Sequence, residues 1–575
     1  MNALTFNAGF APSRIRLVDI RRRQLLTAQL RMLLLGAGFL FCALLALLRI
    51  AWLGVVQPAP AEHSMAQALL PPRGEITDRN GVPLARAFPA YALWYNPDAL
   101  GDGGSPLVKS PAEVAARLHA IFPDLDVAEA TRFLAAGKAG YIRRRVLPEE
   151  VNAVNAIGEL ALETPAEEDR QYPQGRLAAH VLGYVADDGH GRVGMESYLD
   201  NRLLDPSERG KPVPLSIDVR VQGALEDELR SGMEAVNAIG AAGIVLDVDS
   251  GEVLALASLP EFDPNRIDTQ GAKNMFNRAT NEVYELGSTF KPITVAAAMD
   301  AGVVTDLSKR YPATPLHVDG FTIHDDENLG PTLNVPETLI HSSNIVSAQI
   351  ADQLGGKRFK RVLEDLGMNE RPYIELPARG FPIWHKGDWP RLRTMTVGFG
   401  HGIAVTPLHL AAAYSALVNG GIWRPATLLK VKPGDEARGR RVFTEATSAR
   451  MKQLLRMVTV YGTGRKANAP GFRVGGKTGS AEKAAAGGYD RSQVVATFAS
   501  AFPMDKPRYV VVVMLDSPQK VAASSYQRTA AWNAVPIVGR LIPRIGPLLG
   551  VMPDDNRDID LSDLKPLVGD GGGNE

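Results

Sequence analysis

Three short groups of residues in the second half of the chain could together carry out acyl transfer. In the first group, Ser288 is followed three positions later by Lys291. Residues three apart share one face of a helix, so the lysine amine can lie within hydrogen-bond reach of the serine hydroxyl and act as its base. Because only a neutral lysine accepts a proton, burial or a second cation must lower its pKa. A helix-capping serine beside a solvated lysine has the same spacing, so this pair alone is weak evidence.

The other two groups follow in chain order. Ser342-Ser343-Asn344 lies in a turn before a predicted helix, where its first serine could relay a proton. Lys477-Thr478-Gly479-Ser480 lies on a predicted strand. Its lysine could bind a substrate carboxylate and repel the proton from Lys291, and its glycine lets a ligand lie close to the strand. Taken singly, helix capping and an edge strand protected by a charge are the simpler interpretations.

The N-terminal sequence predicts that the domain with these three groups is anchored to a membrane. Residues 1–31 contain six arginines against the single acidic residue Asp19. Residues 32–56 form an apolar stretch interrupted only by Arg49, and the stretch is long enough to cross a bilayer. The positive-inside rule places residues 1–31 in the cytoplasm and the remainder outside. A cleavable signal peptide is the alternative, because Ala59-Pro60-Ala61 matches a cleavage site, but the apolar stretch is longer than a usual signal.

Length, charge and cysteine content exclude several classes of protein and site. The 575 residues include 63 basic and 63 acidic residues, so the length predicts several folded units and the charge balance argues against a dedicated nucleic-acid binder. The single cysteine, Cys42, lies in the apolar stretch. An intramolecular disulfide and a cysteine-based metal site are therefore excluded, and the exported part has no thiol.

Two domains with different patterns are predicted after the anchor, at residues 57–212 and 213–550. The first begins with strands at 74–77 and 82–85, joined by an Asn80-Gly81 turn of type I′, and continues mainly helical over 107–160. The second has strands near both ends and helices between them, which predicts an α+β fold with one antiparallel sheet whose ends meet. Residues 551–575 are acidic and Gly-rich and predict a flexible tail. The strands of the second domain are expected at 244–248, 253–257, 472–475, 494–501 and 509–515, and its helices at 290–300, 345–354 and 407–418.

In this order and on these kinds of element, the three groups resemble the active-site motifs of penicillin-binding proteins. The match to class B of that family extends over nearly the whole chain. Tyr284-Glu285-Leu286-Gly287 and the short first domain are most similar to the division-specific, alphaproteobacterial form. Ser480 departs from the family's usual threonine but keeps the hydroxyl. Other segments that resemble the family are Arg73-Gly74-Glu75-Ile76, Asp78-Arg79-Asn80-Gly81, Arg170-Gln171-Tyr172-Pro173, Gly194-Met195-Glu196, Ser258-Leu259-Pro260, Asn277-Arg278-Ala279 and Gly398-Phe399-Gly400-His401-Gly402.

The resemblance implies a single transmembrane helix, an elongated β-rich pedestal (dimerisation-type) domain and a β-lactamase-like transpeptidase domain with helices on both sides of its sheet. It implies a serine D,D-transpeptidase that cross-links peptidoglycan stem peptides ending in D-Ala-D-Ala at the division septum and has a carboxypeptidase side activity. The enzyme would lie in the cytoplasmic membrane with its catalytic domain in the periplasm. It would bind β-lactams covalently, need no cofactor or metal, and work with a polytopic glycan polymerase and other division proteins.

The same resemblance assigns roles to the residues. Ser288 is expected to attack the penultimate D-Ala carbonyl and Lys291 to take its proton, with the backbone N–H groups of Ser288 and Ser480 forming an oxyanion hole. The full catalytic set is expected to be Ser288, Lys291, Ser342, Asn344 and Lys477, with Thr478, Gly479 and Ser480 binding substrate.

Several alternatives share part of this pattern. An elongation-specific class B enzyme has the same motifs, while a D,D-carboxypeptidase or a β-lactamase would not explain the anchor and pedestal. A β-lactam sensor would need a larger cytoplasmic or multi-span signalling part than residues 1–31 provide. About 150 residues between anchor and second domain are too few for an added glycosyltransferase domain. Residues 324–327 (His-Asp-Asp-Glu) could be metal ligands, but adjacent side chains on one loop rarely converge on one ion, so a polar loop is predicted. Residues 462–466 resemble a phosphate loop only loosely and predict a loop near the third motif.

Overall fold

The computed structural model describes residues 14–55, 73–99, 107–186, 188–267, 269–485 and 488–568. These residues belong to two units, residues 1–70 and residues 71–575. In the first unit, α1 (Arg14–Val55) is one continuous helix of 42 residues. Its segment Leu25–Arg49 has a mean hydropathy of 2.2, is not buried, and is long enough to cross a membrane. The apolar stretch thus forms a helix as predicted, whereas Ala59-Pro60-Ala61 lies outside the described residues.

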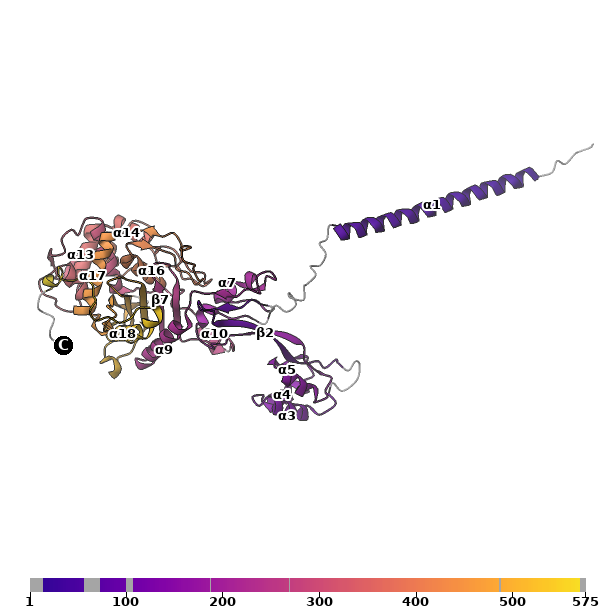
Figure 1. Ribbon diagram of the computed structural model, residues 1–575, viewed down its shortest axis with the longest axis horizontal. Helices are drawn as coiled ribbons and strands as arrows, with labels where there is room; N and C mark the ends of the chain where they lie inside the picture. Colours follow the sequence, from indigo (N-terminus) through magenta and orange to yellow (C-terminus); the bar gives the residue numbers. More distant parts are fainter. Residues whose placement is uncertain are drawn as a thin grey trace, which may run out of the picture. The chain divides into compact units, whose positions relative to one another are not determined.

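The pedestal is built around the long strand β2 (Pro83–Tyr95). The strand order is β3-β2-β1-β6, and β4 and β5 also pair with β2. Figure 1 shows α3, α4 and α5 gathered at one end of β2, where they enclose a core that includes Leu93 and Leu118. The mainly helical prediction for residues 107–160 therefore missed one strand, β3. The bounds are β1 (Ile76–Thr77), β3 (Gly140–Val146), β4 (Leu162–Glu163), β5 (Ala166–Gln171), β6 (Val213–Pro214), α3 (Pro111–Ile121), α4 (Val127–Ala135), α5 (Pro148–Asn155), α6 (Ala179–Leu182), α7 (Gly194–Tyr198) and α8 (Asp200–Leu204).

The turn between β1 and β2 is a hairpin as predicted, but it is not of type I′. A type I′ turn needs positive φ at both central residues, and Gly81 has φ +87° while Asn80 stays outside that region. The Asp78 carboxylate accepts the backbone N–H groups of Asn80 at 2.7 Å and Val82 at 2.8 Å. This side chain closes the turn in place of the second left-handed residue.

Three pedestal segments that resemble the family meet in one buried ion-pair network. Glu196 is fully buried and accepts Nε–H groups from Arg73 at 2.8 Å and from Arg170 at 2.7 Å. Arg73 also donates to Asp200 at 2.7 Å. Because a buried carboxylate is stable only with its partners in place, the network joins segments that lie about 100 residues apart in sequence.

The second domain holds a five-stranded sheet in the order β15-β16-β17-β7-β8. All neighbours in it are antiparallel, and the late strand β17 pairs with the early strand β7, so the predicted meeting of the sheet's ends is confirmed. The strand predicted at 472–475 is wrong. Arg473 has φ +49°, which interrupts extended backbone there, and β15 begins only at Gly475. The bounds are β7 (Gly240–Asp247), β8 (Val253–Leu259), β15 (Gly475–Ala485), β16 (Gly488–Phe502) and β17 (Tyr509–Asp516).

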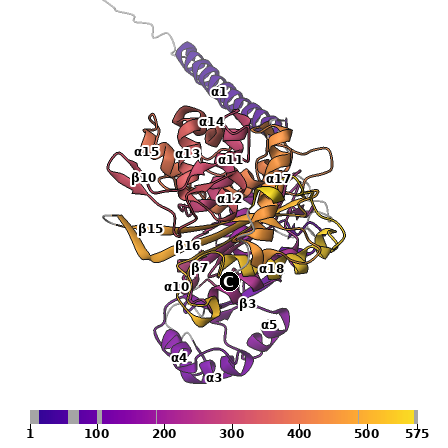
Figure 2. The ribbon, with the colours of Figure 1, turned by 90° about the vertical axis from the view of Figure 1, so that its left-hand side faces the viewer.

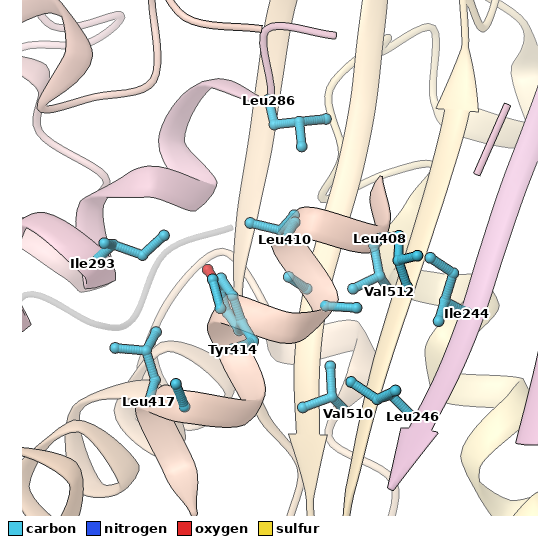
Figure 3. Close-up of a cluster of buried hydrophobic side chains, with 14 of the residues drawn as sticks. Ile244, Leu246, Leu286, Ile293, Leu408, Leu410, Tyr414, Leu417, Val510 and Val512 are labelled. Atoms are coloured by element: carbon cyan, nitrogen blue, oxygen red, sulfur yellow. The ribbon is translucent and has the colours of Figure 1, made fainter. Parts of the chain in front are cut away.

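Helices cover both faces of this sheet, as Figure 2 shows for α11–α13 on one side and α18 on the other. Strand β17 explains why both faces are apolar. Val510 and Val512 point into one hydrophobic core with α16, while Val511 and Val513 point into the other with α9 and α18. Figure 3 shows Leu408 of α16 beside Val512 of β17 in the first core. The main helices are α9 (Val219–Ala235), α11 (Lys291–Asp300), α12 (Val335–Ile340), α13 (Asn344–Leu354), α16 (Pro407–Val418), α17 (Glu445–Tyr461) and α18 (Ala534–Ile545).

Shorter elements complete the domain. They are α10 (Thr269–Asn274), α14 (Gly356–Asp365), α15 (Arg391–Val397), β9 (Tyr311–Pro312), β10 (Leu316–Val318), β11 (Phe321–Ile323), β12 (Thr332–Leu333), β13 (Ile422–Trp423), β14 (Arg440–Arg441) and five 3₁₀ turns, η1 (Gly287–Phe290), η2 (Arg465–Ala467), η3 (Ala522–Ser524), η4 (Pro547–Leu549) and η5 (Lys565–Leu567).

The predicted flexible tail is wrong for residues 551–568, which pack against the second domain. We call residues 554–568 the C-terminal strap. Asp558 pairs with Arg456 of α17, and Leu564 is 2% exposed within the domain's core. Two of the acidic residues that suggested a solvated tail, Asp558 and Asp563, thus pair with arginines of α17, while residues 569–575 lie outside the described part of the chain.

Candidate active site

The first group lies on η1 and the start of α11. Ser288 is in the 3₁₀ turn and is half-buried, and Lys291 is the first residue of the α-helix. Gly287 has φ +55°, and a Cβ there would lie 3.3 Å from the Ser480 carbonyl oxygen, so glycine suits this close approach. From α16, the Tyr414 hydroxyl donates to the Thr289 carbonyl at 2.9 Å; Figure 3 shows this tyrosine. This buried hydrogen bond between α16 and the Thr289 carbonyl therefore holds the 3₁₀ turn in place.

Lys291 joins the first and second groups. Its side chain is fully buried, and its Nζ donates to Ser342 Oγ at 3.1 Å, to Asn344 Oδ1 at 2.8 Å and to the Ser342 carbonyl. Three donated hydrogen bonds are those of an ammonium, whereas a base for Ser288 needs a free lone pair. These bonds therefore hold Lys291 beside Ser342, the proposed proton relay. The Lys291 ammonium must lose one proton before it can act as a base.

The second group is positioned by the start of α13. Ser342 takes φ +63°, and Ser343 caps the helix by accepting the Val346 N–H. Asp325 strengthens this end, because its carboxylate accepts the Asn344 N–H at 2.5 Å and the Ser343 hydroxyl at 2.7 Å. The loop of residues 324–327 is thus a polar loop, as predicted, with Asp325 turned to the helix end. Sequence reasoning missed this support because a cap contributed by a distant loop leaves no local signal.

The third group lies on β15, which is an edge strand of the sheet. Lys477 is fully buried, and its Nζ donates to the carbonyl and the hydroxyl of Thr478, both at 3.1 Å. A Cβ at Gly479 would lie 2.3 Å from the Leu286 carbonyl oxygen, so the strand runs directly against the turn that carries the serine. Ser480 accepts the Ala530 N–H on its Oγ at 2.9 Å. Gly479 and Ser480 thus lie directly against the turn of the first group.

A fourth contributor, Thr463, was not predicted as a site residue. It follows Gly462 at the end of α17, and its hydroxyl lies 2.7 Å from the Thr478 hydroxyl. The residues that loosely resembled a phosphate loop therefore lie beside the third group, which confirms the predicted location. Their Gly-Thr-Gly sequence was the available signal, but it carried no information on what the threonine would contact.

Burial lowers the pKa of both lysines. The pKa of Lys291 falls to about 7, with the nearby carboxylates of Asp325 and Asp326 partly offsetting the effect of burial. The pKa of Lys477 falls well below its ordinary value, first through burial and then through the charge of Lys291. The sequence argument had Lys477 repelling the proton from Lys291. In the structure burial accounts for the lowered pKa of Lys291, and the repulsion acts on Lys477.

A further group of polar residues contacts Glu285, which lies three residues before Ser288. Glu285 accepts the Gly402 N–H at 2.9 Å and the Tyr489 hydroxyl at 3.3 Å. The His401 ring packs edge-on against Tyr489, and burial together with the charge of Lys291 lowers its pKa to about 4. His401 is therefore neutral near pH 7 and adds no positive charge to the site.

These residues can perform covalent acyl transfer. A serine on a half-buried turn, a buried lysine of pKa about 7 and a second buried lysine converge from two helices and an edge strand. Among the residues that the structure describes, no group of three or more His, Cys, Asp or Glu side chains could hold a metal ion.

Known proteins share both domains. Residues 241–536 match the penicillin-binding protein transpeptidase domain, and residues 68–211 match the penicillin-binding protein dimerisation domain. The chain is 37% identical to the probable peptidoglycan D,D-transpeptidase FtsI of Caulobacter vibrioides, over 91% of this chain and 89% of that protein. The chain belongs to the class B penicillin-binding protein family. The probable peptidoglycan D,D-transpeptidase PenA of Neisseria gonorrhoeae is 31% identical over 79% of this chain and 81% of its own length.

The fold of this class B penicillin-binding protein also matches solved structures. Penicillin-binding protein 3 of Mycobacterium tuberculosis in complex with aztreonam aligns with a TM-score of 0.65 at 24% identity, covering 84% of this chain and 98% of that one. The α+β prediction, with a pedestal before the transpeptidase domain, is confirmed.

Proposed function

We propose that this protein is a membrane-anchored peptidoglycan D,D-transpeptidase that cross-links stem peptides ending in D-Ala-D-Ala during septal wall synthesis and binds β-lactams covalently. The relatives named as D,D-transpeptidases support the reaction class, and FtsI of Escherichia coli is a further one, 29% identical over 89% of this chain. The observation that carries the proposal is the contact of buried Lys291 with Ser342 and Asn344 beside β15.

The reaction follows from the placement of these groups. Ser288 Oγ attacks the carbonyl carbon of the penultimate D-Ala, and its proton passes to neutral Lys291. The backbone N–H groups of Ser288 and Ser480 stabilise the oxyanion, each such donor contributing roughly 3–4 kcal/mol. The C–N bond to the terminal D-Ala breaks, and the leaving amine takes a proton through Ser342. An amine of a second stem peptide then attacks the ester, forms the cross-link and returns the proton to Ser288.

The remaining residues bind and orient. Asn344 holds the Lys291 amine through its Oδ1 atom, and Lys477 with Thr478 offers an amine and a hydroxyl as hydrogen-bond donors to the substrate carboxylate. Gly479 leaves space for a ligand main chain against β15. β-Lactams present the same carbonyl and carboxylate, so they would acylate Ser288 and remain attached.

Covalent labelling by a fluorescent penicillin tests the nucleophile. The full chain in detergent should be labelled with one probe per protein, and Ser288→Ala should abolish labelling. Ser207→Ala, at an exposed serine of the pedestal, is the matched control and should label like the wild type. Undiminished labelling of Ser288→Ala would overturn the assignment, and loss of labelling with Ser207→Ala would point to a general defect in the preparation.

The cellular setting is part of the same proposal. We place residues 1–31 in the cytoplasm, the anchor at 32–56, the pedestal at 57–212 and the transpeptidase domain at 213–550 in the periplasm. The arginine excess on the N-terminal side of the apolar stretch supports this orientation. A polytopic glycan polymerase and other division proteins are the proposed partners. Depletion should give filamentous cells, whereas rounded cells would indicate the elongation-specific role instead.

A further inference from the structure

The C-terminal strap packs on the transpeptidase domain through both apolar and polar contacts. Leu564 is almost fully buried in the domain's core, and Ile559, Leu561 and Leu567 pack against the same core. Two of the strap's polar contacts reach residues that directly support active-site groups. These two contacts lie nine residues apart, at Asp558 and at Leu567.

The first contact acts on the strand that carries Lys477. Arg456 of α17 is 6% exposed, and its Nε and Nη2 atoms donate to the Asp558 carboxylate at 2.9 Å and 2.6 Å. Its Nη1 atom donates to the Val474 carbonyl at 2.9 Å and to Asn468 Oδ1 at 2.7 Å. Val474 immediately precedes β15 and lies three residues before Lys477. Because the guanidinium is planar, the carboxylate that fixes one edge also sets the direction of the other.

The second contact acts on the segment that leads to Ser342. The Leu567 carbonyl accepts an N–H from the Asn334 side chain at 2.6 Å. The same asparagine caps α12 by accepting the Glu337 N–H at 2.9 Å. Helix α12 ends at Ile340, two residues before Ser342. One segment therefore holds the supports of both the second and the third group.

The position of β15 depends on such support more than that of an inner strand. In the described sheet β15 pairs only with β16, so the opposite edge receives no strand. Its start is instead held from α17, where Thr459 joins Arg456 in donating to the Val474 carbonyl. A displacement of about 1 Å in a catalytic group lowers reaction rates by up to about 100-fold.

We propose that the C-terminal strap is a positioning element of the active site, in which Asp558 acts through Arg456 to place the Lys477 strand. The inference rests on the proposed function, because acylation is its readout. It goes beyond that function by assigning part of the catalytic geometry to residues that touch neither substrate nor Ser288.

Acylation kinetics of the full chain in detergent test this role. The two quantities to measure are the rate constant of labelling by a fluorescent penicillin and the fraction of protein finally labelled. Asp558→Asn removes the charge that orients Arg456, and we expect a rate about tenfold lower with an unchanged labelled fraction. Asp563→Asn is the matched control, since this strap residue pairs with the more exposed Arg450. Its rate should stay within about twofold of the wild type.

Two results would overturn the positioning role. The first is a rate for Asp558→Asn no lower than that of Asp563→Asn. The second is a smaller labelled fraction whose rate is unchanged, which is what a purely structural contribution produces. If Asp558→Asn does not fold, Asp558→Glu keeps the charge and moves the carboxylate by one methylene; a wild-type rate for it would also contradict the inference. Absence of labelling in the wild type would instead contradict the proposed function.

Discussion

Acylation should follow the ionisation of Lys291 with a midpoint near neutral pH. Burial lowers the pKa of this lysine to about 7 from the ordinary 10.5, which corresponds to on the order of 5 kcal/mol against the charged form. At pH 7 about half of the enzyme then has the neutral base, against roughly 0.03% for an unperturbed lysine. The buried position thus increases the usable base by about 1,500-fold.

The direction of the pH dependence follows because only the neutral form of Lys291 is active. Protonated Lys291 cannot accept the serine proton, so the rate should fall about tenfold per pH unit well below pH 7 and level off above about pH 8. Labelling rates with a fluorescent penicillin between pH 5 and 9 measure this profile. The labelled fraction at each pH separates slow chemistry from loss of folded protein.

A charge substitution tests the cause of the profile. Asp326 is exposed, and its carboxylate raises the pKa of Lys291. Asp326→Asn should therefore move the midpoint to lower pH and increase the rate at pH 6. Glu327→Gln, at the next residue, removes an equal charge that does not act on the lysine and should leave the midpoint unchanged. A flat profile, or one that still rises between pH 8 and pH 9, would refute the assignment of Lys291 as a buried base.

Further substitutions test the packing around the serine. Gly479→Ala should reduce labelling by at least about 100-fold, because its Cβ would lie 2.3 Å from the Leu286 carbonyl oxygen. Gly223→Ala, on an open face of α9, is the control; it should label normally and raise the free energy of unfolding by up to about 1 kcal/mol in denaturant titration. Tyr414→Phe should lower the free energy of unfolding by about 1 kcal/mol and slow acylation, since the Thr289 carbonyl loses its donor; unchanged values of both would show that the hydrogen bond is dispensable.

Much of the transpeptidase fold could be predicted because its signals are local. Short apolar runs predicted β7, β8, β16 and β17, although β16 begins six residues before its predicted start, and the helix predicted at 407–418 matches α16 residue for residue. The predicted start of β15 was wrong because Arg473 takes a left-handed conformation, which an arginine in the sequence does not predict. Strand β3 was missed because its three consecutive arginines give no period-two pattern.

In the active site, too, residues with a local sequence signal could be predicted and residues without one could not. Ser288, Lys291 and the second and third groups could be found because each is a short sequence with a defined spacing. Asp325 and Thr463 could not, because their roles come from loops that fold back over 15 or more residues. The tail was misjudged for a related reason. Acidic composition predicts solvation unless the basic partners are known, and Arg456 lies 102 residues before Asp558.

The unpaired edge of β15 has a consequence for how resistance to inhibitors could arise. An edge strand offers peptide N–H and C=O groups, and a ligand that lies along it is recognised by atoms that every residue type shares. Substitution of the side chains cannot remove these atoms. It can only tilt or shift the strand, as the change from threonine to Ser480 illustrates by preserving both the main chain and the hydroxyl. Variants that escape β-lactams on this scaffold should therefore be selected at residues that bear on the strand's placement rather than along its exposed edge.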